Sequence, residues 1–469
     1  MVGRFKVRLS EMLEQAEISP ELSEGTLQRL QQFVQPFGEL LASSEQQQHT
    51  QEYVTGLLSK LARKTGEAIA YLHDQDRQGI QKFIGQVSWD HQPLLNTLAR
   101  QVGEQIGVPE GVIVFDPSGF AKKGNKSVGV ARQWCGRLGK IDNCQVGIYM
   151  GYVSPQEHAL VNVRLYLPRR WAEDRKRCRE AGVPGKTRFR TRHTLALEML
   201  TEQGSALPHR WVTGDDEMGR SSSFREELRE RKERYLLAVP SNTRIRDLES
   251  EAPTKTNSGR APQRPFQQVA KWCSVLPEGA WTRIDVRDGE KGPLVIEALQ
   301  RRVQTKQGQR NGPEEILMVT RERQSDGSLK QDYYLAYTLG EPQSLAEFCR
   351  VAKAEHRIEE CLQRNKSEAG LAAYQVRNWI GWHHHQTLSL LAAWFLNQEL
   401  RRGKKKTPAL TMPRLRDMIA SLLEEYLGCN KPEVVRRRTR RWLRRNEQAR
   451  LYHHHARKVL PALKNRLRL

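Results

Sequence analysis

The sequence lacks several features that would place it in a common class of protein. Its 469 residues hold no apolar run near the ~18 to 20 residues of a membrane span, and MVGRFKVRLSEMLEQ has no apolar signal segment. The seven cysteines are scattered without a C-x-x-C pair, which argues against a disulfide framework and a structural zinc site. No G-x-x-x-x-G-K-[ST] phosphate loop is present. These absences predict a protein of the reducing cytoplasm that does not enter a membrane.

Negative charge is also scarce. The chain has 77 Lys and Arg against 54 Asp and Glu, a formal net charge of +23. Such an excess predicts a polyanionic partner, and nucleic acid is favoured over an acidic membrane surface. Residues 1–100 carry 10 basic and 12 acidic side chains, whereas residues 401–469 carry 21 basic and 5 acidic ones. We therefore predict that 401–469 is a basic helical region that binds DNA.

The densest basic run of that region is predicted to contact the DNA backbone as a helix or arm. A solvated tail is the alternative. The residues concerned are Arg436, Arg437, Arg438, Arg440, Arg441, Arg444 and Arg445.

Residues 1–108 are predicted to form a helical N-terminal domain. Apolar residues recur at helical spacing from Leu27 to Phe37, and VSWDHQP marks a break before a further helix from Pro93 to Ile106. A helical bundle is favoured. A helix-turn-helix that reads DNA is the alternative, although the near-neutral charge does not support it.

The periodicity changes from Gly111, and 109–245 is predicted to be the first part of the catalytic core, with alternating strands and helices. Strands are predicted at 112–115, 145–153, 159–167, 210–213 and 235–239, with helices at 191–203 and 223–231. Ser221 or Ser222 can cap the second helix. This order of elements predicts an α/β fold, a mixed RNase H-like sheet flanked by helices.

Residues 246–342 are predicted to be a linker followed by a β-rich insertion. Polar residues, Pro and Ser dominate up to about residue 264, and short strand-like runs follow at 281–286, 294–303, 316–319 and 333–337. Residues 343–400 would complete the core with a helix that runs from Leu345 through Glu359 towards Asn365.

Two acids stand at the ends of predicted strands. Asp116 follows Val112–Phe115, at the point where Pro117-Ser118-Gly119 predicts a turn, and Asp215 follows the strand 210–213. Carboxyl ends of neighbouring strands share one rim of a sheet, so these acids can converge. With Glu359 they would offer the oxygen ligands that Mg²⁺ prefers, for two ions ~3.5 to 4 Å apart. An ordinary turn at Asp116 and a charged surface helix at Glu359 are the alternatives.

Five motifs in order support a family resemblance. FDPSGFAKKG, VGVARQWCGRLGKIDNCQVGIYMGY, VRLYLPRRW, WVTGDDEMG and HRIEECLQRNKSEAGLAAYQVRNWIGWHHHQTLSLLAAWFL together resemble a DDE transposase of bacterial insertion sequences. The chain is similar to the cut-and-paste branch with a β-strand insertion before the catalytic Glu. The resemblance implies that Asp116, Asp215 and Glu359 are catalytic and bind two Mg²⁺ ions, with Mn²⁺ as a substitute. Asp215 rather than Asp216 fits the motif ending at Gly219.

The resemblance also implies partners. Terminal inverted repeats and target DNA would be bound by a homodimer in the synaptic complex, in the bacterial cytoplasm at the nucleoid. Family members carry Tyr and Arg seven and four positions before the Glu, where this chain has Ala352 and Glu355. Lys366, seven positions after the Glu, fits the pattern, and Lys353 or Arg357 could replace the missing Arg in contacting DNA.

Two further groups are predicted to touch DNA. The loop after Asp116 carries Lys122, Lys123 and Lys126, which could hold a phosphate near the metals. In the insertion, Trp272 or Trp281 could stack on a flipped base, as the resemblance allows, with a core tryptophan as the alternative.

The sequence thus predicts a transposase that cleaves the ends of its insertion sequence and joins them to target DNA. A catalytically silent DNA-binding repressor and a structure-specific nuclease with the same core are the alternatives.

Overall fold

The structure is a computed structural model that describes residues 23–251, 264–289, 292–324, 326–405, 407 and 410–466. The chain divides into two compact units. The helical unit comprises residues 1–89, 368–375 and 395–469, and the sheet unit comprises 90–367 and 376–394. Within the described residues, no helix is both long and apolar enough to cross a membrane.

The helical unit is built from amphipathic helices that enclose a core of Leu, Phe and Val. Phe33, for example, packs against Phe37 and Phe395 at ring-centroid distances of 5.3 and 5.4 Å. The predicted helices of the N-terminal region are confirmed in its described part. The helices of this unit are α2 (Thr26–Gly38), α3 (Ser44–Leu58), α4 (Gly66–Leu72), α5 (Arg77–Gly85), α15 (Met412–Tyr426) and α16 (Pro432–Arg466).

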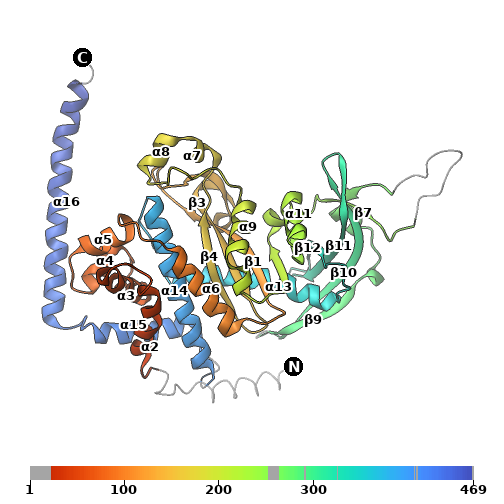
Figure 1. Cartoon of the computed structure of the whole chain (residues 1–469), viewed down its shortest axis with the longest axis horizontal. Coiled ribbons are helices and arrows are strands. Elements are labelled where there is room, and N and C mark those ends of the chain that lie inside the picture. Colours follow the sequence, from red (N-terminus) through yellow and green to blue (C-terminus); the bar gives the residue numbers. More distant parts are fainter. Residues whose placement is uncertain are drawn as a thin grey trace. The chain divides into compact units, whose positions relative to one another are not determined.

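The sheet unit begins with α6 (Gln92–Ile106), close to its predicted bounds, and continues into the sheet (Figure 1). Five strands form the RNase H-like part, in the spatial order β4-β3-β1-β5-β6. β1, β5 and β6 are parallel, and β3 is antiparallel to both β1 and β4. The predicted mixed sheet is confirmed. These strands are β1 (Val112–Ala121), β3 (Lys140–Val153), β4 (His158–Leu165), β5 (Trp211–Gly214) and β6 (Tyr235–Val239).

The helices predicted at 191–203 and 223–231 are confirmed as α9 and α11, whereas three short helices, α7, α8 and α10, were not predicted. Thr191 caps α9 and Ser221 caps α11, because each side chain accepts a hydrogen bond from a backbone N–H of the first turn. The helices between strands are α7 (Arg169–Glu173), α8 (Arg175–Glu180), α9 (Arg192–Gln203), α10 (Asp216–Gly219) and α11 (Ser222–Glu230).

Two long helices, α13 (Leu345–Glu368) and the first part of α14 (Trp379–Lys404), cover one face of the sheet. Register identifies this face, since residues paired across strands point the same way. On β3 it carries Gly147, Tyr149 and Gly151. A Cβ on Gly151 would lie 2.5 Å from Ile358 Cδ1, and Tyr149 donates a 2.6 Å hydrogen bond to Gln386 of α14. Glycine at 151 is therefore what lets α13 approach the sheet closely.

The β-rich insertion extends the same sheet. β12 pairs antiparallel with β6, and β11, β10, β7 and β8 follow. β9 pairs with the first part of β10, on the same side as β7 and opposite to β11. Part of the predicted linker, 252–263, lies outside the described residues, and β7 and β8 lie on either side of it. The insertion consists of β7 (Arg244–Asp247), β8 (Gln267–Gln268), α12 (Val269–Cys273), β9 (Thr282–Gly289), β10 (Gly292–Gln307), β11 (Arg310–Arg323) and β12 (Leu329–Tyr337).

Two local predictions need correction. β1 does not turn at Pro117-Ser118-Gly119 but continues to Ala121, because β3 is long enough to pair with it along its whole length. A short strand, β2 (Ala131–Cys135), was not predicted; it pairs with the start of β3. Proline is tolerated at position 117 because β5 pairs only with Val112–Phe115, so from Asp116 onward β1 has a paired strand on one side alone.

Candidate active site

Asp116 and Asp215 follow directly after a pair of residues that face each other in neighbouring parallel strands. Phe115 of β1 is in register with Gly214, the last residue of β5, and the two acids are the next residues along the chain. Asp116 pairs with Tyr149 of β3, which places its side chain on the face that α13 and α14 cover. The Asp215 carboxylate caps α10, accepting a 3.1 Å hydrogen bond from the Met218 N–H.

Helix α13 presents two glutamates to this region. Ile358 packs on the sheet at Gly151, and at ~100° per residue Glu355 lies about 60° around the helix from Ile358 and Glu359 about 100°. Glu355 is consequently closer to the sheet, and it is partly buried. Glu359 is further round, with its side chain 75% exposed and its Oε2 3.6 Å from Nδ1 of His356.

Burial and repulsion between carboxylates raise the pKa values of the carboxyls nearest the sheet. Burial is the largest cause that raises the pKa of Asp116 to about 8, with Asp215 and Glu359 adding to it and Lys366 opposing. Burial likewise raises the pKa of Asp215 to about 7, although its hydrogen bond from Met218 acts in the other direction. The pKa of Glu355 is well above its ordinary value because of burial and the nearby Asp215 and Asp116. These acids form one electrostatically coupled group.

Lys366 is the cation of this group. Its Nζ donates a 2.7 Å hydrogen bond to Ser118 Oγ and lies 5.2 Å from the centre of the Phe120 ring. Ser118 is two residues beyond Asp116 on the same face of β1, since it pairs with Gly147. One lysine cannot balance four carboxylates, so the group in its ionised form needs further positive charge.

The chemistry of this donor set suits a hard divalent cation. Asp116, Asp215 and Glu355 offer partly buried carboxyl oxygens, and Glu359 adds an exposed one. As the described side chains stand, no three His, Cys, Asp or Glu are arranged around one metal position. The fit therefore rests on the uncompensated charge of these oxygens, which a cation would stabilise.

The chain is similar to known proteins along more than half of its length. The sequence profile described as "DDE superfamily endonuclease" matches residues 36–293, more than half of the chain. The chain belongs to the DDE superfamily endonucleases. The matched span contains Asp116 and Asp215 and ends before α13.

Two individual proteins are also similar to this chain. A "Probable transposase for insertion sequence element IS701" of Microchaete diplosiphon is 28% identical over 195 residues, which cover 40% of this chain and 47% of the relative. The chain thus spans about half the length of this curated relative. A solved structure of the piggyBac transposase synaptic complex with hairpin DNA aligns with a TM-score of 0.38 at 11% identity, covering 87% of this chain and 80% of that one.

Asp216, the neighbour of Asp215, makes a different contact. Its Oδ2 accepts a 2.6 Å hydrogen bond from Arg220 Nη2, and its side chain is 51% exposed. The carboxyl of Asp215, in contrast, is a cause of the raised pKa of Asp116. The two aspartates thus differ in their surroundings, and the choice of Asp215 as the site residue stays a prediction.

The predicted DNA contacts close to the acids fall into two groups. Lys123 and Lys126 are exposed on the loop after β1, whereas Lys122 is partly buried and burial lowers its pKa to about 8. Arg357 does not face the acids: it donates hydrogen bonds of 2.6 to 2.9 Å to the carbonyls of Ser154, Pro155 and Gln156 in the β3–β4 turn. Arg357 therefore holds α13 to that turn.

The predicted stacking tryptophans lie in the core of the insertion. Trp272 is 4% exposed within an apolar cluster with Val303 and Leu317, and its Nε1 donates to Asp247 at 3.1 Å. Trp272 is thus a core tryptophan, the favoured of its two predicted roles, and its ring is not exposed for stacking on a base. Trp281 packs against the same cluster, and the guanidinium of Arg321 lies 4.3 Å from its ring centre.

The arginine run of α16 divides between two faces of the helix. Arg438 donates to the Tyr71 and Leu72 carbonyls, Arg437 and Arg441 pair with Asp74, and Arg445 pairs with Glu67. These contacts fasten α16 to α4 and the turn after it, within the helical unit. A second set is exposed and makes no ion pair or hydrogen bond with any described residue: Arg436, Arg440 and Arg444.

Sequence reasoning missed Glu355 as part of the site. The residue stood out only as a departure from the family pattern, which has Arg there. The available signal was the spacing Glu355-Glu359-Lys366, since residues 4 and 11 positions apart share a helix face.

Proposed function

We propose that this endonuclease is a transposase that cleaves the ends of an insertion sequence and joins them to target DNA. The observation that carries the proposal is the convergence of Asp116, Asp215 and α13 on one face of an RNase H-like sheet. The family profile and the similarity to a transposase of an insertion sequence support it.

In this proposal Asp116, Asp215 and Glu359 are the metal ligands and Glu355 is a fourth carboxylate of the site. Two Mg²⁺ ions, or Mn²⁺, would supply activation of the attacking oxygen and stabilisation of the departing 3′-oxygen. The carboxylates would orient those ions, and Asp215 is held in place by capping α10. Lys366, positioned by Ser118, would bind the phosphate next to the scissile one.

The bond changes are the same in both steps. A water oxygen attacks phosphorus, the P–O3′ bond breaks, and the element end is left with a 3′-hydroxyl. That hydroxyl then attacks a phosphodiester of target DNA, forming a new P–O bond and releasing a 3′-oxygen of the target. One acid site can perform both steps, because each is an in-line displacement at phosphorus.

The proposal also covers the oligomeric state, the DNA partners and the cellular location. A homodimer would bring two terminal inverted repeats together in a synaptic complex, and Arg436, Arg440 and Arg444 would bind their backbone. The enzyme would act in the bacterial cytoplasm at the nucleoid, where its DNA lies.

Cleavage of labelled DNA tests the proposal directly. The substrate is the DNA that flanks the reading frame, with a plasmid as target and Mg²⁺ or Mn²⁺ as metal. We expect nicked and joined products, and a loss of at least about a thousandfold in rate for Asp116→Ala, Asp215→Ala and Glu359→Ala.

Asp216→Asn is the matched control, because Asp216 pairs with Arg220; this variant should retain activity within a few fold. Cleavage that survives Asp116→Ala would refute the assignment. Nicking without joining would indicate a structure-specific nuclease, and metal-independent DNA binding without nicking a repressor.

A further inference from the structure

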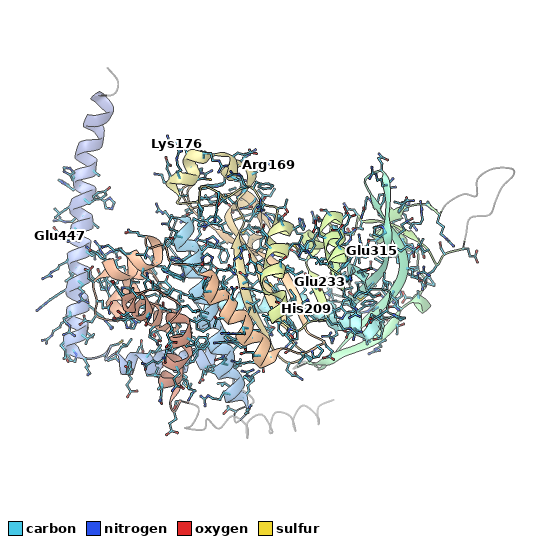
Figure 2. The ribbon with its side chains drawn as sticks, viewed as in Figure 1. Arg169, Lys176, His209, Glu233, Glu315 and Glu447 are labelled. Carbon is cyan, nitrogen blue, oxygen red and sulfur yellow. The ribbon has the colours of Figure 1, made fainter. Side chains whose placement is uncertain are left out.

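A second basic region lies in the sheet unit, between β4 and α9. Residues 169–192 contain 10 Lys and Arg against 3 Asp and Glu, a density comparable to that of α16. Figure 2 labels two of them, Arg169 and Lys176, on the segment that carries α7 and α8. We call residues 169–192 the basic segment.

The few acidic residues of the basic segment do not balance its positive charge. Glu173 pairs with Arg169 at 3.6 Å, and Asp174 caps α8 by accepting a 2.9 Å hydrogen bond from the Arg177 N–H. Four exposed cations remain whose side chains have no ion-pair or hydrogen-bond partner among the described residues: Arg170, Lys176, Arg179 and Lys186.

The segment is held in a defined position next to the loop that follows Asp116 and β1. Trp171 donates a 2.7 Å hydrogen bond to the Val130 carbonyl. The Arg177 guanidinium stacks 3.6 Å from the centre of the Trp171 ring and donates a 2.6 Å hydrogen bond to the Asn125 carbonyl. Lys126 of that loop and Lys176 of the segment line the same cavity of about 520 Å³.

Strand direction places the start of the segment at the edge of the sheet where the acids lie. β4 is antiparallel to β3, which is antiparallel to β1, so β4 and β1 run the same way, as does β5. The carboxyl ends of all three strands therefore meet at one edge. The chain leaves β4 there and enters α7.

A larger cavity connects the end of the basic segment with Asp215. It measures about 810 Å³ and is lined by Trp134, Tyr166, Phe189, Arg192 and Asp215, among others. Trp134 is 55% exposed, and the Arg192 guanidinium lies 4.8 Å from the centre of the Tyr166 ring. Aromatic rings beside cations are the combination that holds nucleotide bases and their phosphates.

We infer that the basic segment, together with Lys123 and Lys126, binds the DNA backbone and leads the strand to Asp215. The occupant is DNA rather than another polyanion because the surface ends in an aromatic cavity beside a proposed phosphodiester-cleaving site. The inference thus rests on the proposed function for its ligand, and it adds a surface distinct from the arginines of α16.

The test measures how binding depends on salt, without cleavage. A fluorescently labelled random-sequence duplex of about 30 base pairs is titrated with the full chain in EDTA, and log Kd is plotted against log salt concentration. Neutralising Arg170, Lys176, Arg179 and Lys186 together to Gln should lower the slope by about 3 to 4 and weaken binding about tenfold to a hundredfold.

Two variants control for folding and for charge alone. Exchanging Lys for Arg and Arg for Lys at the same four positions keeps the charge, and it should keep the slope. The second variant removes equal charge elsewhere by changing four exposed cations of the insertion to Gln: Lys271, Arg283, Arg310 and Arg323. It should lower the slope by less than 1 unit, because counterion release requires contact with phosphate.

A slope that is unchanged in the segment variant, or is lowered equally in the insertion variant, would overturn the inference. Binding in EDTA separates this outcome from failure of the proposed function: a chain that binds as described but never nicks DNA with Mg²⁺ refutes only the latter. A chain that nicks DNA while its segment variant binds like the unaltered chain refutes only the inference.

Discussion

Two glutamates one turn apart on α13 have very different surroundings. Glu355 lies on the side of the helix nearer the sheet, in the field of Asp215 and Asp116, while Glu359 is mostly exposed at the rim. The family pattern that the sequence resembles has Arg at the position of Glu355. With Glu there, the proposed metal ligands have one more carboxylate beside them, so we expect the site to depend more on bound cations.

We predict that Glu355→Gln weakens metal binding and stabilises the metal-free fold. Removing a buried negative charge relieves repulsion from Asp116 and Asp215, so the melting temperature without metal should rise at pH 8. Mn²⁺ affinity, measured by calorimetry, should fall about tenfold.

Glu359→Gln is the matched control for that experiment. Because Glu359 is largely exposed, its removal should weaken Mn²⁺ binding without changing the metal-free melting temperature by more than about 1 °C. A Glu355→Gln variant that melts lower and binds Mn²⁺ as before would show that Glu355 has only a structural role.

The raised pKa values predict a stability that changes with pH. Folded Asp116 and Asp215 hold their protons up to about pH 8 and 7, whereas in the unfolded chain they lose them near pH 4. The folded metal-free protein thus binds more protons, and the free energy of unfolding should fall as pH rises from 6 to 8.

Mg²⁺ should reverse this trend, because it binds the deprotonated carboxylates. Thermal melts at pH 6 and pH 8, with and without Mg²⁺, measure the effect: the ion should raise the melting temperature more at pH 8. Asp116→Asn should reduce both the pH dependence and the response to Mg²⁺. An equal response at the two pH values would contradict the proposed protonation of the site.

At the scale of the element, α16 shows how one basic helix serves two purposes. One face binds the helical unit through Arg438, Arg441 and Arg445. The other presents Arg436, Arg440 and Arg444, spaced four residues apart on one side of the helix. Composition alone assigns all of these arginines to DNA, and only packing separates them.

We therefore predict that substituting the two faces has different effects. Arg436, Arg440 and Arg444 changed to Gln should lower the salt dependence of DNA binding by about 2 to 3 and leave the melting temperature unchanged. Arg438→Ala with Arg441→Ala should instead destabilise the fold by about 1 to 2 kcal/mol, since partly buried hydrogen bonds to carbonyls are lost.

Denaturant unfolding measures the stability of each variant, and fluorescence anisotropy measures its DNA binding on the same samples. The assignment of two faces to α16 would be wrong if the variant of Arg436, Arg440 and Arg444 lost stability. It would also be wrong if the Arg438→Ala, Arg441→Ala variant kept its stability but lost affinity for DNA.

At the scale of the whole molecule, a long stretch of chain separates the acids that the sheet brings close together. The inserted strands do not form a separate layer, since β12 pairs with β6 and continues the core sheet. Their apolar cluster, which includes Val239 of β6, is continuous with that sheet. The insertion can therefore lengthen the path from Asp215 to α13 without disturbing the strands that carry the acids.

The sequence by itself determined the order of strands and helices, the RNase H-like fold, and Asp116, Asp215 and Glu359 as candidates. Hydrophobic periodicity and short motifs are local properties, so they can be read without a structure. The cap of α11 is local too: the sequence offered Ser221 or Ser222, and the structure has Ser221.

Only the tertiary structure decided which side chains meet. It added Glu355 to the acids, continued β1 past Asp116, buried Trp272, and tied Arg357 to the β3–β4 turn. It also separated the arginines of α16 that bind the helical unit from the exposed ones, and it placed the basic segment beside Asp215. Each of these depends on pairing register and on the rotation of a helix against a sheet, which residues far apart in the chain fix together.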